Sequence, residues 1–293
     1  MTGTDAILIP ARSRRQAMDW SLVLLSQGLE CVVDRLDGGW GLLVETADGE
    51  RATAAIRQYE IENRAARQLT WPGAGFDFAV SLWCLALAGF HWLSAADPAF
   101  KSAGLLDSVA VGNGAWWLIF SAMTLHGDLA HLMANLTAGF AILGLAMARY
   151  GPGCALLAAF LAGAGGNIAG LWLRAEAYHG LGSSGMVMGG LGLLTVQSLA
   201  LWHANPGGRV WRIIIGGLLA GVLLFTLWGL NPESDVIAHA GGFACGILLG
   251  IPMSMLPQRV LYRVTVNVMT IAALVGLVIG SWTMAWRHGW SPM

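Results

Sequence analysis

The sequence predicts an all-α polytopic membrane protein that carries a small soluble α+β domain at its N-terminus. Of the 293 residues, 56% are apolar and only 11% are charged, whereas soluble domains carry about 25% charged residues. Seven apolar stretches follow residue 76, and each is close to the roughly 20 residues that a helix needs to cross a bilayer. Basic residues are concentrated before these stretches, because residues 1–70 hold 8 of the 16 lysines and arginines.

The N-terminal domain, residues 1–70, is expected to fold as β-α-β-β-α. The run "AILIP" and the runs "ECVVDR" and "GWGLLVE", which flank the turn "LDGG", have the composition of strands. Residues 13–29 have helical periodicity, and "DGE" begins a second helix that extends to Arg64. The domain shows no constellation of catalytic residues, which favours an accessory or regulatory role. The Pro/Gly linker "TWPGAG", residues 70–75, follows it.

The apolar stretches are predicted to span the membrane with the N-terminus in the cytoplasm. They cover residues 77–95, 129–148, 152–173, 182–203, 210–229, 236–256 and 264–286. With residues 1–70 inside, five arginines fall in cytoplasmic loops (Arg149, Arg209, Arg212, Arg259, Arg263) against three basic residues outside (Lys101, Arg174, Arg287). Because an excess of basic residues marks the cytoplasmic side, the C-terminus is expected to be extracytoplasmic.

Several classes of ligand are disfavoured by composition. The net charge is −1, which gives no electrostatic reason to expect a nucleic-acid partner. The four cysteines form no C-x-x-C pair, and we expect free thiols instead of disulfides or a zinc knuckle. The N-terminus lacks the basic and apolar segments of a signal peptide.

The stretch "GLGSSG", residues 180–185, fits two functional patterns. As G-x-G-x-x-G it could bind a dinucleotide, but that fold needs a preceding strand and an acidic residue about 20 positions later. Here "RAEAYH" precedes it and "WHANPGG" follows at that distance, so we expect no nucleotide. The alternative is a nucleophilic serine, which needs a neighbouring base to take its proton.

Candidates for the base and for supporting groups occur at the same membrane depth. His239 lies near the outer end of the sixth stretch, as Ser184 does in the fourth. The run "LHGDLAHLMANL" places His131 and Asn135 four residues apart, on one helix face. An imidazole and a carboxamide can donate hydrogen bonds to a developing oxyanion, and polar residues at this depth are costly and usually functional.

Three motifs together resemble the signature of the rhomboid intramembrane serine proteases. They are His131-Leu-Met-Ala-Asn135, Gly182-Ser-Ser184-Gly185 and Ala238-His239-Ala-Gly-Gly242. Their order, spacing and shared leaflet match H-x-x-x-N, G-x-S-G and A-H-x-x-G of that family, and "GN" at residues 166–167 resembles its third span. The resemblance implies a six-helix rhomboid-like catalytic membrane domain over residues 71–256, with an additional C-terminal transmembrane helix over residues 257–293.

The resemblance also implies roles for individual residues. Ser184 would be the nucleophile and His239 its base, in a dyad that requires no cofactor and no metal. The oxyanion hole would consist of His131, Asn135 and the backbone N–H of Ser184. Three further residues are accessory candidates: His126, which matches a second upstream histidine, Gly182 of the serine motif, and Trp228, a candidate for a substrate gate.

Some positions depart from the family pattern. Trp116-Trp117-Leu118 lacks the arginine of the family's first external loop, Met147 stands where a glutamate is common, and Met188 replaces an aromatic residue. A catalytic triad through Asp235 is disfavoured, because this residue belongs to the polar loop "NPESD".

The implied function is cleavage of client transmembrane helices near the extracytoplasmic face by a multi-pass serine endopeptidase, expected in a bacterial inner membrane. The alternative is a catalytically inactive rhomboid-like protein that binds client membrane helices. Other classes fit less well. The chain has no H-E-x-x-H for a metalloprotease, no carboxylate pair well inside the spans for an aspartyl protease, and no inverted repeat typical of a transporter.

Overall fold

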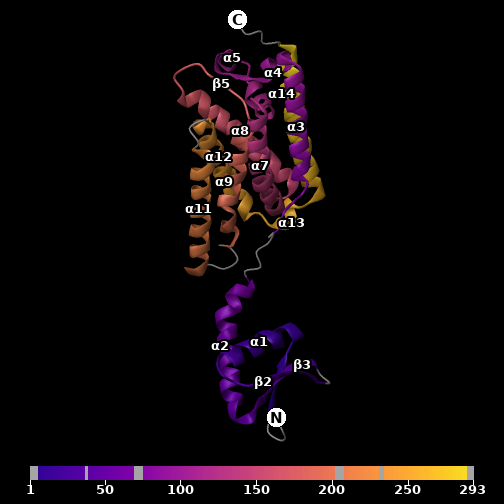
Figure 1. The fold of residues 1–293 in the computed structure, drawn as a ribbon, viewed down its shortest axis with the longest axis vertical. Helices are drawn as coiled ribbons and strands as arrows, with labels where there is room; N and C mark the ends of the chain where they lie inside the picture. Colours follow the sequence, from indigo (N-terminus) through magenta and orange to yellow (C-terminus); the bar gives the residue numbers. More distant parts are fainter. Residues whose placement is uncertain (1–5, 37–38, 69–74, 202–207, 231–233, 289–293) are drawn as a thin grey trace. The chain divides into compact units, whose positions relative to one another are not determined.

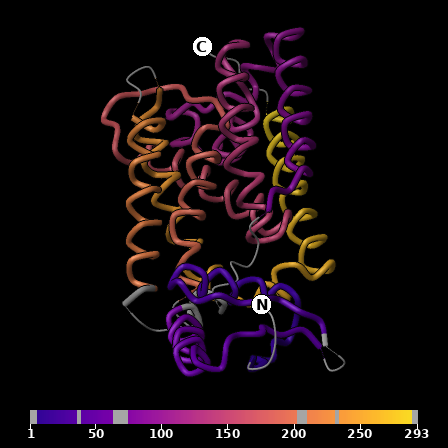
Figure 2. The backbone as a smooth tube through the Cα atoms, turned by 60° about the horizontal axis from the view of Figure 1, so that its bottom comes forward, coloured from indigo at the N-terminus to yellow at the C-terminus, as the bar shows by residue number. Residues whose placement is uncertain are grey.

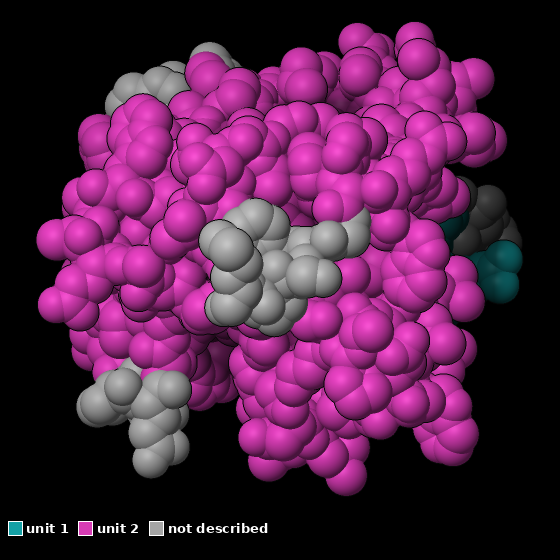
Figure 3. Space-filling model, turned by 90° about the horizontal axis from the view of Figure 1, so that it is seen from above, with its two compact units in different colours: residues 1–70 teal, residues 71–293 magenta. Residues whose placement is uncertain are grey.

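A computed structural model describes residues 6–36, 39–68, 75–201, 208–230 and 234–288. The chain forms two compact units, residues 1–70 and 71–293, coloured separately in Figure 3. Most of the predicted linker and the centre of the predicted "LDGG" turn lie outside the described residues. The finer division of the second unit into residues 71–256 and 257–293 stays a prediction.

The first unit combines a small sheet with two helices. Its elements are β1 (Ala6–Ala11), α1 (Arg14–Ser26), β2 (Cys31–Leu36), β3 (Gly39–Glu45) and α2 (Gly49–Gln68). The strands are antiparallel in the order β1-β3-β2. The Ser13 side chain accepts from the N–H of Gln16 and so fixes the start of α1. Trp20 and Leu24 of α1 and Leu42 of β3 belong to one cluster of buried apolar residues, which is the core of this unit.

The second unit is a helical assembly, as the apolar stretches predict (Figure 1). Its long helices are α3 (Val80–Ala96), α7 (Leu129–Tyr150), α8 (Pro152–Leu173), α9 (Ser184–Thr195), α11 (Gly208–Gly229), α12 (Val236–Met255) and α14 (Val264–Arg287). Among the described residues, five of them (α7, α8, α11, α12 and α14) are long and apolar enough to cross a membrane, whereas α3 and α9 are shorter. The chain is therefore a multi-pass membrane protein.

The fourth predicted span is not one continuous helix: residues 200–201 are helical, but α9 itself ends at Thr195. A short 3₁₀ turn, Gln197–Leu199, follows, and residues 202–203 lie outside the described residues. Side-chain hydroxyls bond two carbonyl groups near the end of α9. The Thr195 hydroxyl donates to Leu191 O at 2.8 Å, and the Tyr150 hydroxyl donates to Leu193 O at 2.8 Å.

A long connection joins α3 to α7. It contains α4 (Pro98–Gly104), β4 (Leu106–Asp107), α5 (Ser108–Gly112), α6 (Leu118–Ser121) and the 3₁₀ turn η2 (Ala122–Thr124). Strand β4 pairs antiparallel with β5 (His179–Gly180), which directly precedes the serine motif. Figure 2 draws the backbone of this connection as part of a smooth tube. The connection is thus tied to the segment that carries Ser184.

Helix α9 packs closely against α12 because small residues face each other. A Cβ on Gly242 would come within 2.3 Å of Gly185 O, and a Cβ on Gly246 would come within 2.1 Å of Gly189 O. Side chains at these positions would push the two helices apart, so the glycines allow their close approach. The first turns of α9 and α12, which carry Ser184 and His239, therefore lie side by side.

Candidate active site

Ser184 is the first residue of α9. Two residues before it lies Gly182, at a position that requires glycine. Gly182 has φ = +122°, and a Cβ there would lie 2.9 Å from two ring atoms of His131 and 3.9 Å from Ser184 Oγ. The Gly182 N–H donates to Ala122 O at 3.0 Å. At the start of a helix the first backbone N–H groups have no intrahelical partner, so this loop presents free donors beside the Ser184 hydroxyl.

The neighbouring Ser183 points the other way, into the protein. It is fully buried, and its Oγ forms a hydrogen bond of 3.2 Å with Nε2 of His126. Burial, with smaller contributions from His131 and His91, lowers the pKa of His126 to about 3, which keeps this imidazole neutral at working pH. The two adjacent serines are thus distinguished by their surroundings.

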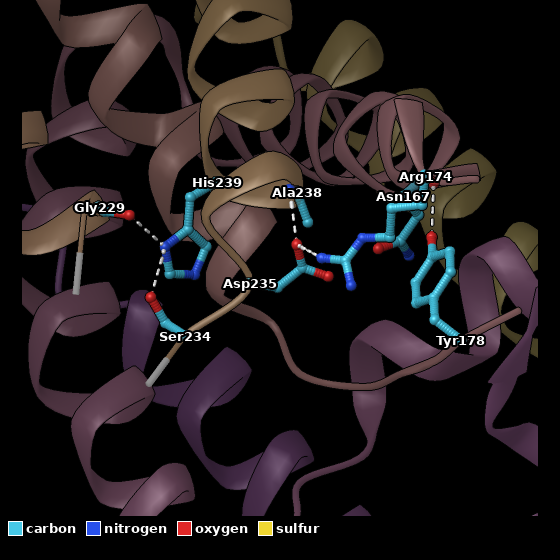
Figure 4. A network of polar contacts seen from close by, with 8 residues as sticks. All are labelled: Asn167, Arg174, Tyr178, Gly229, Ser234, Asp235, Ala238 and His239. Carbon is cyan, nitrogen blue, oxygen red and sulfur yellow. Dashed lines mark hydrogen bonds and ion pairs between the residues drawn. The ribbon is translucent and has the colours of Figure 1, made fainter. Parts of the chain in front are cut away.

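His239 lies in the first turn of α12, 4% exposed, and is oriented by the end of α11 (Figure 4). Its Nδ1 is 2.9 Å from Gly229 O and 3.4 Å from Ser234 Oγ. A carbonyl oxygen can only accept, so Nδ1 carries the proton and donates it to Gly229. In a neutral imidazole the other nitrogen is then an acceptor. Nε2 is buried and has no hydrogen-bond partner among the described residues.

Asp235 fixes the start of α12 but does not contact the His239 ring. Its carboxylate accepts from the Ala238 N–H at 3.0 Å and pairs with the Arg174 guanidinium (Figure 4). Arg174 in turn lies over the Tyr178 ring, 4.3 Å from its centroid. The carboxylate is therefore engaged by α12 and by the end of α8, which agrees with the absence of Asp235 from the predicted dyad.

His131 lies in the first turn of α7, with one nitrogen turned toward the serine loop. Asp128 caps the helix by accepting from the His131 N–H at 2.8 Å, and this bond holds the pKa of the Asp128 carboxyl below its usual range. The Gly127 N–H donates weakly to His131 Nδ1 at 3.5 Å. With Nδ1 as an acceptor, Nε2 carries the proton, and this donor lies next to Gly182.

Asn135 is buried one turn further along α7. Its Nδ2 donates to His131 O at 2.9 Å, so one of its two amide hydrogens bonds a carbonyl group of the same helix. The second hydrogen remains for another acceptor. The four residues of the predicted site thus come from the first two turns of α7 and the first turns of α9 and α12.

Two atoms at the centre of the site have no partner. In the part of the chain that the structure describes, neither Ser184 Oγ nor His239 Nε2 takes part in a hydrogen bond that meets normal geometry, and none joins them. Catalytic hydrogen bonds are often long in the absence of substrate and tighten in the substrate complex. Within the same residues, no group of three or more His, Cys, Asp or Glu side chains could hold a metal ion.

Comparison with known proteins identifies this arrangement of helices. Residues 113–256, about half of the chain, match the family model described as the rhomboid domain. The chain belongs to the rhomboid family. The match contains all three motifs, from His131 to Gly242, and excludes the N-terminal unit and α14.

Curated relatives of this rhomboid come from bacteria and plants. The chain is 30% identical over 153 residues to the rhomboid protease GluP of Bacillus subtilis (51% of the chain, 29% of the relative). It is 26% identical over 166 residues to RHOMBOID-like protein 5 of Arabidopsis thaliana (55% and 52%), and 26% identical over 167 residues to the rhomboid protease AarA of Providencia stuartii (50% and 59%). The chain thus spans between about a third and three fifths of these relatives.

Sequence reasoning missed several contacts of this rhomboid's site. The Gly229 carbonyl, as a backbone group, has no signature in the sequence. The His126–Ser183 pair had a partial signal, since Ser183 lies inside the serine motif and His126 lies five residues before His131. Trp228, named as a gate candidate, is 46% exposed on α11, next to the residue that holds His239.

The positions that depart from the family pattern are mostly packed. Met147 and Met188 are buried, and Met188 belongs to an apolar cluster with Phe243. Trp116 is half-exposed and contacts Trp117 edge to face. Met147 therefore packs as an apolar side chain where the family commonly has a glutamate, and Met188 does so where the family commonly has an aromatic ring.

Proposed function

We propose that this rhomboid is an active intramembrane serine endopeptidase with Ser184 as nucleophile and His239 as general base. The observation that carries the proposal is the Nδ1–H bond from His239 to Gly229 O, because it leaves Nε2 as a buried acceptor without a partner. The close α9–α12 packing supports the pairing of this nitrogen with Ser184.

The proposed reaction begins with transfer of the Ser184 hydroxyl proton to His239 Nε2 as Oγ attacks the scissile carbonyl carbon. The resulting oxyanion accepts hydrogen bonds from His131 Nε2–H, the Asn135 amide and the Ser184 N–H. Collapse of the intermediate breaks the C–N bond, and the imidazolium returns its proton to the departing amine. Water, deprotonated by the same nitrogen, then hydrolyses the acyl-enzyme.

The proposed substrates are transmembrane helices of other proteins, cleaved near the extracytoplasmic face. A carbonyl inside a helix is already hydrogen-bonded within that helix, so the segment must unwind before attack. Clients with small or helix-breaking residues near their outer ends are expected for this reason. The proposed orientation, with the N-terminus in the cytoplasm of a bacterial cell, places the first turns of α7, α9 and α12 on the outer side.

Labelling with a fluorophosphonate tests this proposal against an inactive helix-binding relative. The purified detergent-solubilised protein should become covalently labelled, because the reagent reports an activated serine. Ser184→Ala should remove the label, whereas Ser183→Ala, its matched control, should keep it in the folded fraction. Absence of label on the folded wild-type protein would instead favour the inactive helix-binding protein.

A further inference from the structure

The last helix, α14, reaches the α3–α7 connection through one tryptophan. Trp282 Nε1 donates to Thr124 Oγ1 at 3.1 Å, although the two residues are 158 positions apart. The indole ring stacks on Phe100 at 4.1 Å and covers Gly104 so closely that a Cβ there would lie 2.5 Å from the ring. We propose that Trp282 is a positioning residue for the catalytic serine and acts through the turn η2.

The turn η2 is built from buried hydroxyls that have few alternatives. Thr124 is 5% exposed, and its hydroxyl donates to Ser121 O at 2.7 Å. Ser121 is fully buried, and its hydroxyl donates to Gly104 O at 2.9 Å. Both hydroxyls thus donate their hydrogens to carbonyl groups of the α3–α7 connection. The Thr124 oxygen in turn accepts a hydrogen bond from the Trp282 N–H. Because buried polar groups need partners, these contacts fix the turn against α14.

The turn η2 and His126, which follows it closely, hold the serine loop at two points. Ala122 O accepts from the Gly182 N–H at 3.0 Å, and His126, two residues after the turn, bonds Ser183 Oγ at 3.2 Å. Gly182 and Ser183 immediately precede Ser184. A shift of the turn would therefore move the nucleophile, and misplacement by about 1 Å can cost 10²-fold in rate.

Helix α14 can act as a brace because its other end is also fixed. Asn267 is 9% exposed and accepts from the Gly153 N–H of α8 at 2.8 Å through Oδ1. Its Nδ2 donates to Leu261 O at 2.7 Å and to Arg263 O at 3.1 Å. One helix thus joins the α7–α8 corner to the turn beside Ser184.

A double-mutant cycle tests the positioning role of Trp282. This role rests on the proposed function, because the cycle is read out by substrate cleavage. Trp282→Phe keeps an aromatic ring but removes the N–H, and Thr124→Val keeps the shape but removes the acceptor. We expect each to lower kcat by about tenfold or more, with KM changed less than about twofold. Because Thr124→Val removes the bond to Ser121 O as well as the bond to Trp282, the double variant should be no worse than Thr124→Val alone.

Two controls separate positioning from folding. Thr124→Ser retains the hydroxyl and should keep kcat near the wild-type value. Trp286→Phe makes the same change one turn further along α14, at a side chain that is 61% exposed, and should leave kcat unchanged. All rates are divided by the folded fraction, measured by thermal unfolding of the same preparation.

The outcomes are distinguishable. If both single variants keep kcat within about twofold, or if their losses multiply in the double variant, Trp282 does not act through Thr124. The same conclusion follows if the loss of activity is fully accounted for by unfolded protein. A wild-type protein that neither cleaves nor takes up fluorophosphonate would overturn the proposed function, and the positioning role with it.

Discussion

His239 donates its Nδ1 hydrogen to the backbone carbonyl of Gly229, 2.9 Å away at the end of α11. A backbone carbonyl thus occupies the place that a carboxylate has in a Ser-His-Asp triad, where it orients the imidazole and selects the tautomer. The orientation of the His239 ring, the proposed base, therefore depends on where α11 ends, and the nearby Ser234 hydroxyl, at 3.4 Å, is a secondary contact.

The ranking of these two contacts predicts different effects for two variants. His239→Ala should abolish cleavage of a reporter transmembrane substrate, because it removes the proposed base of Ser184. Ser234→Ala should reduce kcat by less than about threefold, because the bond to Gly229 remains. Steady-state cleavage in detergent measures both. A Ser234→Ala variant as inactive as His239→Ala would show that the hydroxyl, and not the carbonyl, orients the base.

Asp235 is predicted to stabilise α12 without taking part in catalysis. Asp235→Ala removes the helix cap, which typically costs about 0.5–2 kcal/mol, and also breaks the pair with Arg174. Asp235→Asn keeps a good capping residue and loses only the charge, so its Tm should fall less. In the folded fraction, kcat should stay within about threefold of wild type for both variants. A near-complete loss of kcat in Asp235→Asn, with Tm preserved, would indicate a triad carboxylate.

The proposed oxyanion hole predicts a kinetic effect of Asn135→Ala. Losing one such donor typically lowers kcat by about 10²–10³-fold, with little change in KM because the bond forms in the transition state. Slow labelling of Ser184 by fluorophosphonate should persist. The observed bond from Asn135 Nδ2 to His131 O suggests the competing role, support of the first turn of α7. That role predicts a lower Tm with kcat reduced less than tenfold.

Membrane orientation is predicted by the distribution of basic residues and can be measured with impermeant thiol reagents. After removal of the native cysteines, a cysteine placed near residue 60 should be protected in intact cells, whereas one near residue 290 should react. The excess of arginine in the proposed cytoplasmic loops is the reason. The opposite labelling pattern would place cleavage at the cytoplasmic face and contradict the proposed site of action.

The sequence predicts the helices of the membrane unit well because the bilayer imposes a length and an apolar composition on each of them. It also nominates Ser184, His131 and His239 as candidate site residues, since polar residues in apolar spans are rare, and their roles stay predictions. The interruption of the fourth span after Thr195 was not predicted, because the sequence pattern does not show tertiary contacts such as the Tyr150–Leu193 bond beside it. The Gly229 carbonyl and the Trp282–Thr124 bond were missed for the same reason, as they arise only from tertiary packing.

The central claim, that Ser184 and not Ser183 is the nucleophile, is tested most directly by the cleavage rate of a transmembrane reporter substrate with the two serine variants. Removal of the Ser183 hydroxyl leaves the buried His126 without its partner, at a cost in stability of about 1–3 kcal/mol, so rates are compared per folded molecule. Ser184→Ala should show no cleavage, and Ser183→Ala should retain substantial activity. An inactive Ser183→Ala beside an active Ser184→Ala would contradict the account.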